Sequence, residues 1–149
     1  MFMKSDPPVK KTLKLKVNDA ISFRLVGISS HENDYRLVWA INNQLRMGFI
    51  RAENLVVHHA KLNTELAFSR FLYADEDRIH NYTLISNRCP DGFLFPEIRN
   101  FDFIIQVSGN MTEAEENEFI KKLKTVEVIS ASFALKTEKL KDLKVILPE

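Results

Sequence analysis

The sequence predicts an α+β domain with an antiparallel-rich sheet and two helices. Apolar and polar residues alternate with a period of two in several short runs, which indicates strands. Two longer segments space their apolar residues as amphipathic helices do, and a capping-box pattern precedes each of them. Because one strand–helix–strand unit lies near each end of the chain, the order of elements allows a ferredoxin-like arrangement with hairpins inserted between its halves.

The chain of 149 residues has the length of one ordinary domain. We assign residues 1–11 to a flexible tail, because Asp6-Pro7-Pro8 resists helix formation and the lysines around it are solvated charges. Residues 12–149 then form a single α+β domain. Its first two elements are a half-exposed strand at 13–17 and a more buried strand at 21–28.

The first helix is predicted over Ser30–Leu45. Ser29 and Glu32 have the spacing of a capping box, in which two otherwise unpaired amides of the first turn are satisfied. The apolar face of this helix is formed by Leu37, Val38, Ile41 and Leu45.

The middle third of the chain is rich in strands. We expect strands at 49–57, 66–73 and 79–87, the last two joined by an acidic turn at 74–77. Cys89-Pro90-Asp91-Gly92 has the composition of a tight turn, and it leads to a short strand at 93–95 that Pro96 closes. The clearest alternation in the sequence follows at 101–107.

The second helix is predicted over Thr112–Thr125. Thr112 and Glu115 form its capping box, and acidic residues in its first turn and lysines in its last turn complement the helix dipole. A last strand is predicted at 126–135, so the second strand–helix–strand unit occupies the C-terminal part of the chain.

Composition excludes several classes of protein. A formal charge of +1 argues against a nucleic-acid partner, and the lone Cys89 cannot form an internal disulfide. No apolar run is long enough to span a membrane, and the N-terminus does not resemble a secretory signal, so we expect a cytoplasmic protein. Four glycines cannot supply a phosphate-binding or dinucleotide-binding loop, and we expect no cofactor.

Arginine and lysine are separated along the chain. All eight arginines lie between Arg24 and Arg99, and Lys61 is the one lysine in that stretch. Arginine suits oriented pairs with carboxylates or phosphates and tolerates partial burial better than lysine does. The central body is therefore built either for structural Arg–carboxylate pairs, which we favour, or for binding an anion.

The segment from Phe95 to Phe103 is the most distinctive in the chain. Aspartate is a poor strand former, yet Asp102 stands between two phenylalanines of the best predicted strand. If both rings face the core, Asp102 points to the opposite face and needs a donor. We expect its carboxylate to be at least half buried and bonded to Arg70 or Arg88 rather than to Arg99. The candidate polar cluster is Arg70, Arg88, Glu97, Arg99 and Asp102.

Several segments together resemble a known family. They are Phe95-Pro96-Glu97, Asp102-Phe103, Leu25–Ser30, Asp34–Leu37, Phe68–Phe71 and Leu84–Arg88. Over about residues 21–109 the chain resembles the IPExxxDY family of small uncharacterised bacterial proteins, with Phe95-Pro96-Glu97 standing for Ile-Pro-Glu and Asp102-Phe103 for Asp-Tyr. Four residues separate Glu97 from Asp102, where the family name implies three. The resemblance implies a cytoplasmic single domain and no particular activity.

Four sites of possible chemistry have a simpler structural interpretation. Glu97 and Asp102 are a candidate acid/base pair without a neighbouring nucleophile. His58-His59 points to opposite faces if it lies on a strand, which disfavours a shared metal, and we predict no metal site. Cys89 next to Arg88 is a candidate thiolate that needs a positioned base. Six strand aromatics among the arginines are a candidate stacking surface for single-stranded nucleic acid: Phe68, Phe71, Tyr73, Tyr82, Phe101 and Phe103.

The sequence therefore favours a non-catalytic binding or interaction domain, whose partner is a second copy or another protein. The alternative is a small-anion sensor or enzyme that uses the Arg/carboxylate cluster. A concave pocket lined by that cluster would favour the alternative, and a flat apolar patch would favour an interaction domain.

Overall fold

The computed structural model describes residues 23–77 and 79–146. The predicted tail at 1–11 and the predicted strand at 13–17 lie outside the described residues. In chain order the elements are β1 (Arg24–Ser29), α2 (Asp34–Leu45), β2 (Ile50–His59), β3 (Thr64–Asp75), β4 (His80–Ser86), β5 (Arg88–Cys89), β6 (Gly92–Phe93), the 3-10 helix η1 (Pro96–Ile98), β7 (Phe103–Ser108), α3 (Glu113–Lys124), β8 (Ala131–Leu135) and the 3-10 helices η2 (Thr137–Lys139) and η3 (Leu143–Ile146).

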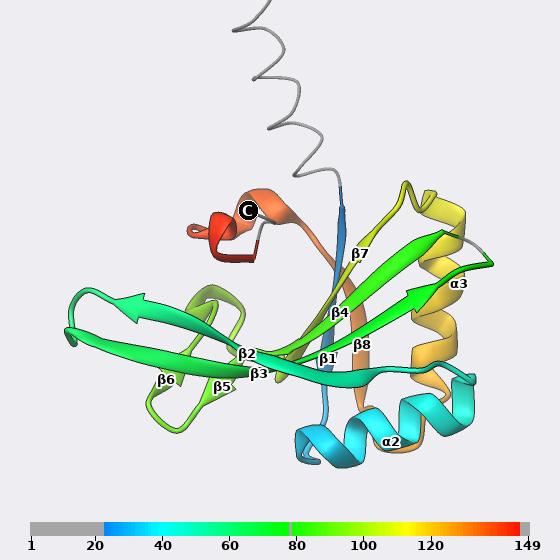
Figure 1. Ribbon diagram of the computed structural model, residues 1–149. Helices are drawn as coiled ribbons and strands as arrows, with labels where there is room; N and C mark the ends of the chain where they lie inside the picture. Colours follow the sequence, from blue (N-terminus) through cyan, green and yellow to red (C-terminus); the bar gives the residue numbers. More distant parts are fainter. Residues whose placement is uncertain (1–22, 78, 147–149) are drawn as a thin grey trace, which may run out of the picture.

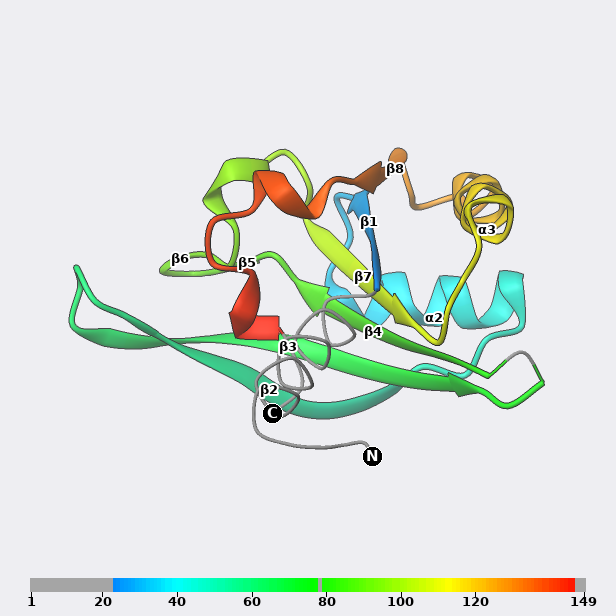
Figure 2. The same cartoon turned by 90° about the horizontal axis from the view of Figure 1, so that it is seen from above.

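The main sheet has six strands in the order β2-β3-β4-β7-β1-β8, and every neighbouring pair is antiparallel. The predicted α+β class with an antiparallel sheet is confirmed. Four of these strands, β8-β1-β7-β4, have the order 4-1-3-2 of a ferredoxin-like sheet. The hairpin β2–β3 is inserted after α2 and extends the sheet beyond β4, with its tip protruding from the body (Figures 1 and 2).

Both helices pack on the same face of the sheet, which we call the helical face (Figure 1). The buried stripe of α2 includes Leu37 and Ile41, and that of α3 includes Phe119 and Leu123. They meet strand residues such as Val26, Phe71, Leu84 and Ile105 in one apolar cluster. The prediction that both helices place their apolar stripes on one sheet is confirmed.

The opposite face, which we call the loop face, is also covered. Its strand residues Leu25, Phe68, Ile85 and Ile104 form a second apolar cluster. Leu94 and Phe95, which follow the β5–β6 hairpin, and Leu140 and Ile146 of the C-terminal segment complete that cluster. The turn predicted at Cys89–Gly92 does join two short strands. Irregular segments therefore take the place that a second helical layer takes in other folds.

The first predicted capping box is wrong, and the second is confirmed. Ser29 is the last residue of β1, and α2 begins four residues later than predicted, with Asn33 as the cap that accepts from the Arg36 amide. The backbone stays extended through Ser29 because β8 pairs with it there. At α3, Thr112 and Glu115 make both bonds of the capping box.

The strands differ from their predicted ranges at their ends, and β7 and β8 begin later than predicted for reasons that the structure shows. β8 begins at Ala131, because the chain leaves α3 through tight turns in which Val126 and Ile129 bury their side chains on the helical face. β7 begins at Phe103 after a bend at Asp102, so Asp102 precedes the strand. The ring of Phe101 instead lies over Gly27, where an added Cβ would come within 2.8 Å of it.

Candidate functional site

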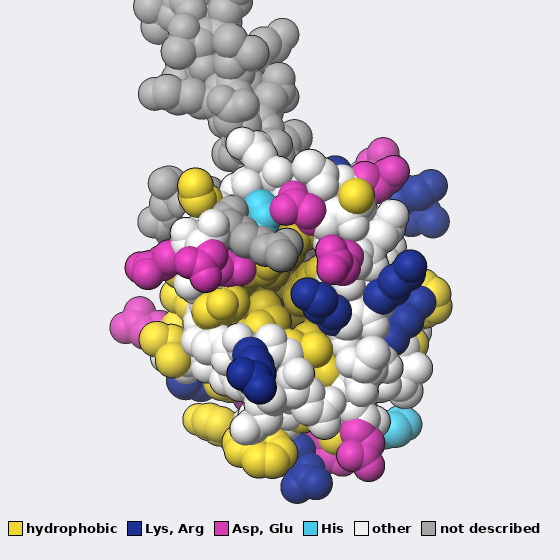
Figure 3. Space-filling view, turned by 90° about the vertical axis from the view of Figure 1, so that its right-hand side faces the viewer, with side chains coloured by type: hydrophobic (Ala, Val, Ile, Leu, Met, Phe, Trp, Pro, Cys, Tyr) yellow, Lys and Arg dark blue, Asp and Glu magenta, His cyan; other side chains and the backbone are white. Residues whose placement is uncertain are grey.

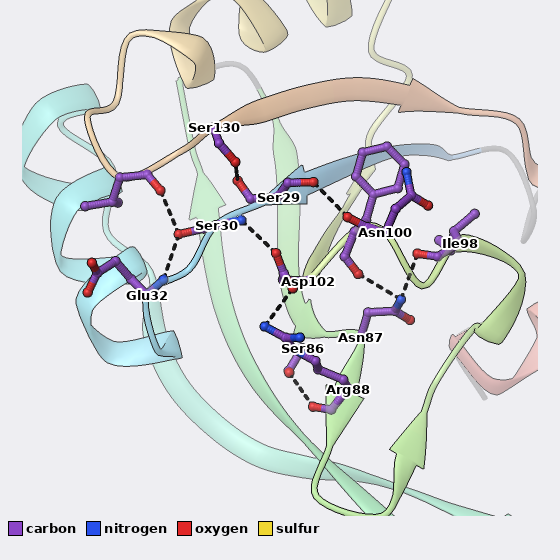
Figure 4. A network of polar contacts seen from close by, with 12 residues as sticks. Ser29, Ser30, Glu32, Ser86, Asn87, Arg88, Ile98, Asn100, Asp102 and Ser130 are labelled. Atoms are coloured by element: carbon purple, nitrogen blue, oxygen red, sulfur yellow. Dashed lines mark hydrogen bonds and ion pairs between the residues drawn. The ribbon is translucent and has the colours of Figure 1, made fainter.

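A polar junction joins β1, β4 and the start of β7, and Asp102 lies at its centre (Figure 4). Asp102 Oδ1 is 2.8 Å from Arg88 Nη2, and its Oδ2 accepts from the Ser30 backbone N–H at 2.8 Å. The Asp102 side chain is 15% exposed and that of Arg88 is 52% exposed. The predicted buried carboxylate bonded to Arg70 or Arg88 is therefore confirmed, with Arg88 as its partner.

Two serines at the end of β1 tie this junction to the neighbouring segments. Ser30 Oγ donates to the Val128 carbonyl at 2.7 Å and accepts from the Glu32 amide. Ser29 Oγ donates to the Asn100 carbonyl at 2.9 Å, and the Ser29 carbonyl accepts from Ser130 Oγ. Three of these bonds satisfy backbone groups of the connecting segments, and the fourth adds to the bond that the Ser29 carbonyl accepts from the Ser130 amide.

Asn87 organises the segment between β4 and β7, and its side chain is fully buried. Its Oδ1 accepts from the Phe95 amide at 2.8 Å. Its Nδ2 lies 3.2 Å from the Ile98 carbonyl (Figure 4), and it lies 3.0 Å from the Phe101 carbonyl and 3.4 Å from the Phe95 carbonyl. One buried amide therefore holds both the loop after β6 and the turn before β7. Sequence reasoning missed this role, because it placed Asn87 at the end of the predicted strand 79–87, where no local pattern indicates a buried amide.

The five residues of the predicted polar cluster do not converge. Arg88 and Asp102 meet, whereas Arg70 lies on the loop face and donates from Nε to the Glu53 carbonyl at 3.0 Å. Glu97 accepts from the Lys141 amide at 2.7 Å and so anchors the C-terminal segment. Arg99 stacks on the Phe93 ring at 5.7 Å. Glu97 and Asp102 therefore have separate structural partners rather than a common acid/base site.

An open groove of about 610 Å³ lies beside the junction, between the N-terminal end of α2, the β2–β3 hairpin and β5. Arg51 and Arg88 are the two arginines in its lining, and both have carboxylate or carbonyl partners. Arg88 pairs with Asp102, and Arg51 donates to the carbonyls of Ala52 and Arg70 and to Asn54 Oδ1. The groove also contains Glu32 and Asp34, so its charge is mixed.

Three further candidates can now be placed. Cys89 and His31 both line the groove, but no hydrogen bond joins them within the described part of the chain. His58 and His59 are consecutive residues of β2 and point to opposite faces. Five of the six strand aromatics are buried, Tyr73 being partly exposed, so they form core rather than a stacking surface for bases.

Among residues 23–77 and 79–146, the outer edge of β2 is the longer of the two sheet edges that pair with no further strand. A bulge lies between Ala52 and Leu55, and the Arg51 side chain bonds across it. Beyond the bulge, the segment Leu55–His59 pairs regularly with β3 along its inner side. Its first three residues are apolar. We call Leu55–His59 the β2 edge segment. Val56 within it is 53% exposed.

Comparison of this chain with protein families, with curated proteins and with solved structures finds no match. Residues 23–77 and 79–146 contain no helix long and apolar enough to cross a membrane. They also contain no group of three or more His, Cys, Asp and Glu side chains placed to hold a metal ion.

Proposed function

We propose that the protein is a non-catalytic interaction domain whose partner is a second copy of itself, bound through antiparallel pairing of the two β2 edge segments. The observation that carries this proposal is the apolar run Leu55-Val56-Val57 on a sheet edge that has no partner strand in the described part of the chain. A free edge presents unpaired N–H and C=O groups, and proteins usually protect it with charges, proline or a bulge. Here the charges Arg51 and Glu53 and the bulge protect only the first half of β2.

The β2 edge segment is suited to pairing with itself. A two-fold axis at Val56 places Val56 opposite its own copy and Leu55 opposite Val57, so the centre of the contact is apolar. Both subunits would then share one continuous antiparallel sheet.

The anion-binding alternative has weaker support. Arg51 and Arg88 already donate to partners in the chain, and the groove that contains them also holds Glu32 and Asp34. Asp102 already neutralises Arg88, so an anion at this guanidinium would compete with a largely buried carboxylate for its charge.

Sedimentation equilibrium of charged variants tests the pairing. Val56→Lys and Val56→Glu each place two like charges opposite each other at the axis, and each should weaken self-association by about tenfold or more. An equimolar mixture of the two variants should restore association, because the pair across the axis is then Lys–Glu. Ile50→Lys, at a position of the same strand that lies outside the segment and is 69% exposed, is the matched control.

Two results would overturn the proposal. The first is a wild-type protein that stays monomeric up to millimolar concentration. The second is association of Val56→Lys that matches that of the wild type. A heterodimer from the mixture with no homodimer of either variant would support the two-fold register specifically.

Membership of the IPExxxDY family and a cytoplasmic location are part of the same proposal. The segments that resemble the family include Leu25–Ser30, Leu84–Arg88 and Asp102-Phe103, which supply most of the polar junction. That concentration supports a shared structural signature. The lone cysteine supports a reducing compartment.

A further inference from the structure

A second concave site lies on the helical side, far along the sheet from the β2 edge segment. It is a hollow of about 150 Å³ between the C-terminal end of α2, the side of α3 and the ends of β3 and β4 that meet them. Figure 3 shows it as an apolar floor with acidic and basic side chains around it. Met47, Tyr73 and Phe119 contribute to the apolar wall, and Asp75, Glu115 and Glu118 are the carboxylates of its lining.

His80 is a buried polar side chain in the wall of this hollow. It is 4% exposed, and neither ring nitrogen has a hydrogen-bond partner within the described residues. Its Nε2 lies 3.6 Å from Glu115 Oε2, which is beyond hydrogen-bonding distance. Buried polar atoms in proteins are nearly always paired, so the unpaired ring of His80 beside a hollow favours the binding of a polar ligand there.

The charges around the hollow favour a cation. Glu115 is held in its ionised form, because the Thr112 backbone N–H donates to its carboxylate and lowers the pKa of Glu115. Glu118 has Lys122 at 4.0 Å, and within residues 23–77 and 79–146 Asp75 and Glu115 are the carboxylates of the rim without a lysine or arginine partner. Burial and the negative charges of Asp75 and Asp77 raise the pKa of Tyr73, and the same field attracts a positive group.

The geometry points to a binding site for a primary ammonium group carried on a small apolar body. The ammonium would lie between the carboxylates of Glu115 and Asp75. There it would also be a polar neighbour for the unpaired ring of His80. The apolar body would rest on Tyr73 and Phe119, whose ring faces also favour a nearby cation. This site is independent of the proposed self-association, since it uses no residue of the β2 edge segment.

NMR titration with phenethylamine tests the site. Amide shifts should move at His80, Glu115 and Phe119 and saturate in the millimolar range or below. 3-Phenylpropionate has the same ring and chain with a carboxylate in place of the amine, and it should bind at least about tenfold more weakly.

Phenylalanine distinguishes two sources of the ammonium group. Tighter binding than phenethylamine would assign the site to amino acids, with Arg46 beside the carboxylate, and weaker binding would assign it to simple amines.

Glu115→Gln is the sharpest variant, because glutamine retains the capping-box bond to Thr112 while the negative charge is removed. We expect it to lose about tenfold or more in amine affinity. Glu113→Gln is the matched control in the same helical turn, outside the hollow, and should bind as the wild type does. Asp75→Asn should also weaken binding, and it repeats the test away from the helix cap.

The inference is wrong if phenethylamine causes no saturable shifts around the hollow. It is also wrong if 3-phenylpropionate binds as tightly as the amine, or if Glu115→Gln and Asp75→Asn both bind like Glu113→Gln.

Discussion

The two faces of the sheet are covered by different means. On the helical face, α2 and α3 supply regular apolar stripes and satisfy their own backbone hydrogen bonds. On the loop face, the segments before β7 and after β8 have little regular structure, and side chains such as Asn87 and Glu97 bond to their backbone groups instead. A helical cover therefore depends on many interchangeable apolar contacts, whereas an irregular cover depends on a few polar side chains that have no substitute.

This difference predicts where single substitutions are most damaging. On the helical face, deletion of one methyl group, as in Ile41→Val, should cost about 0.5–1.5 kcal/mol. On the loop face, the most damaging changes should be at polar positions that a hydropathy profile does not mark.

The largest effect is expected for Asn87→Asp. The variant keeps the acceptor for the Phe95 amide but places a buried carboxylate against the carbonyls of Ile98 and Phe101. We expect a loss of about 3–5 kcal/mol in urea denaturation, because buried groups lose their partners and a charge is desolvated. Asn81→Asp, an exposed change on β4, should be nearly neutral. A small loss at Asn87 would remove the contrast between the faces.

Asp102→Asn should have an intermediate effect. An amide oxygen still accepts from the Ser30 N–H, but the charge that pairs with Arg88 is lost. Breaking a buried pair from one side costs about 3–5 kcal/mol and an exposed pair is worth about 0–1. Because Arg88 is half exposed and water can solvate it, we expect about 1–2 kcal/mol by chemical denaturation. Exposed Asp91→Asn is the control, and an equal loss there would contradict the role of the junction.

Thr112→Ala probes the end of α3 on the helical face. It removes the hydroxyl that accepts from the Glu115 amide. Loss of such a cap costs about 1 kcal/mol. Thermal and urea unfolding should both report this loss, and Thr125→Ala at the other end of the helix should cost less. A loss as large as that of Asn87→Asp would show that the helical face also depends on single polar side chains.

The smallest predicted effect is a pH dependence at Glu115. Its pKa in the folded protein is below the ordinary value of 4.5, mainly because of the Thr112 backbone N–H. The ionised carboxylate therefore stabilises the folded state above that value, and this contribution is lost as the pH falls through the lowered pKa. Between pH 7 and pH 3, the wild type should lose more stability than Glu115→Gln, whose side chain does not titrate. Parallel stability curves for the two proteins would contradict this.

Sequence reasoning predicted the helical face much better than the loop face. Two local signals predicted both helices and their packing. They are the period of the apolar residues in α2 and α3 and the Thr112–Glu115 capping box. Asp102 was also predictable, because a carboxylate between two phenylalanines needs a donor. Asn87 and the Glu97–Lys141 bond were not, since their partners are backbone groups of segments without periodicity. The His80 hollow depends on the approach of α3 to β4, which no local pattern encodes.

The place of β1 in the sheet has a consequence for synthesis on the ribosome. β1 lies between β7 and β8, and its partners are residues 103–107 and 131–135. The strands β2, β3 and β4 can pair with one another as they emerge, whereas β1 must wait for β7. At about 5–20 residues per second this delay lasts several seconds. During that time the apolar stretch Leu25–Ile28 has no partner strand, so the nascent chain presents a binding site for chaperones until β7 has been made.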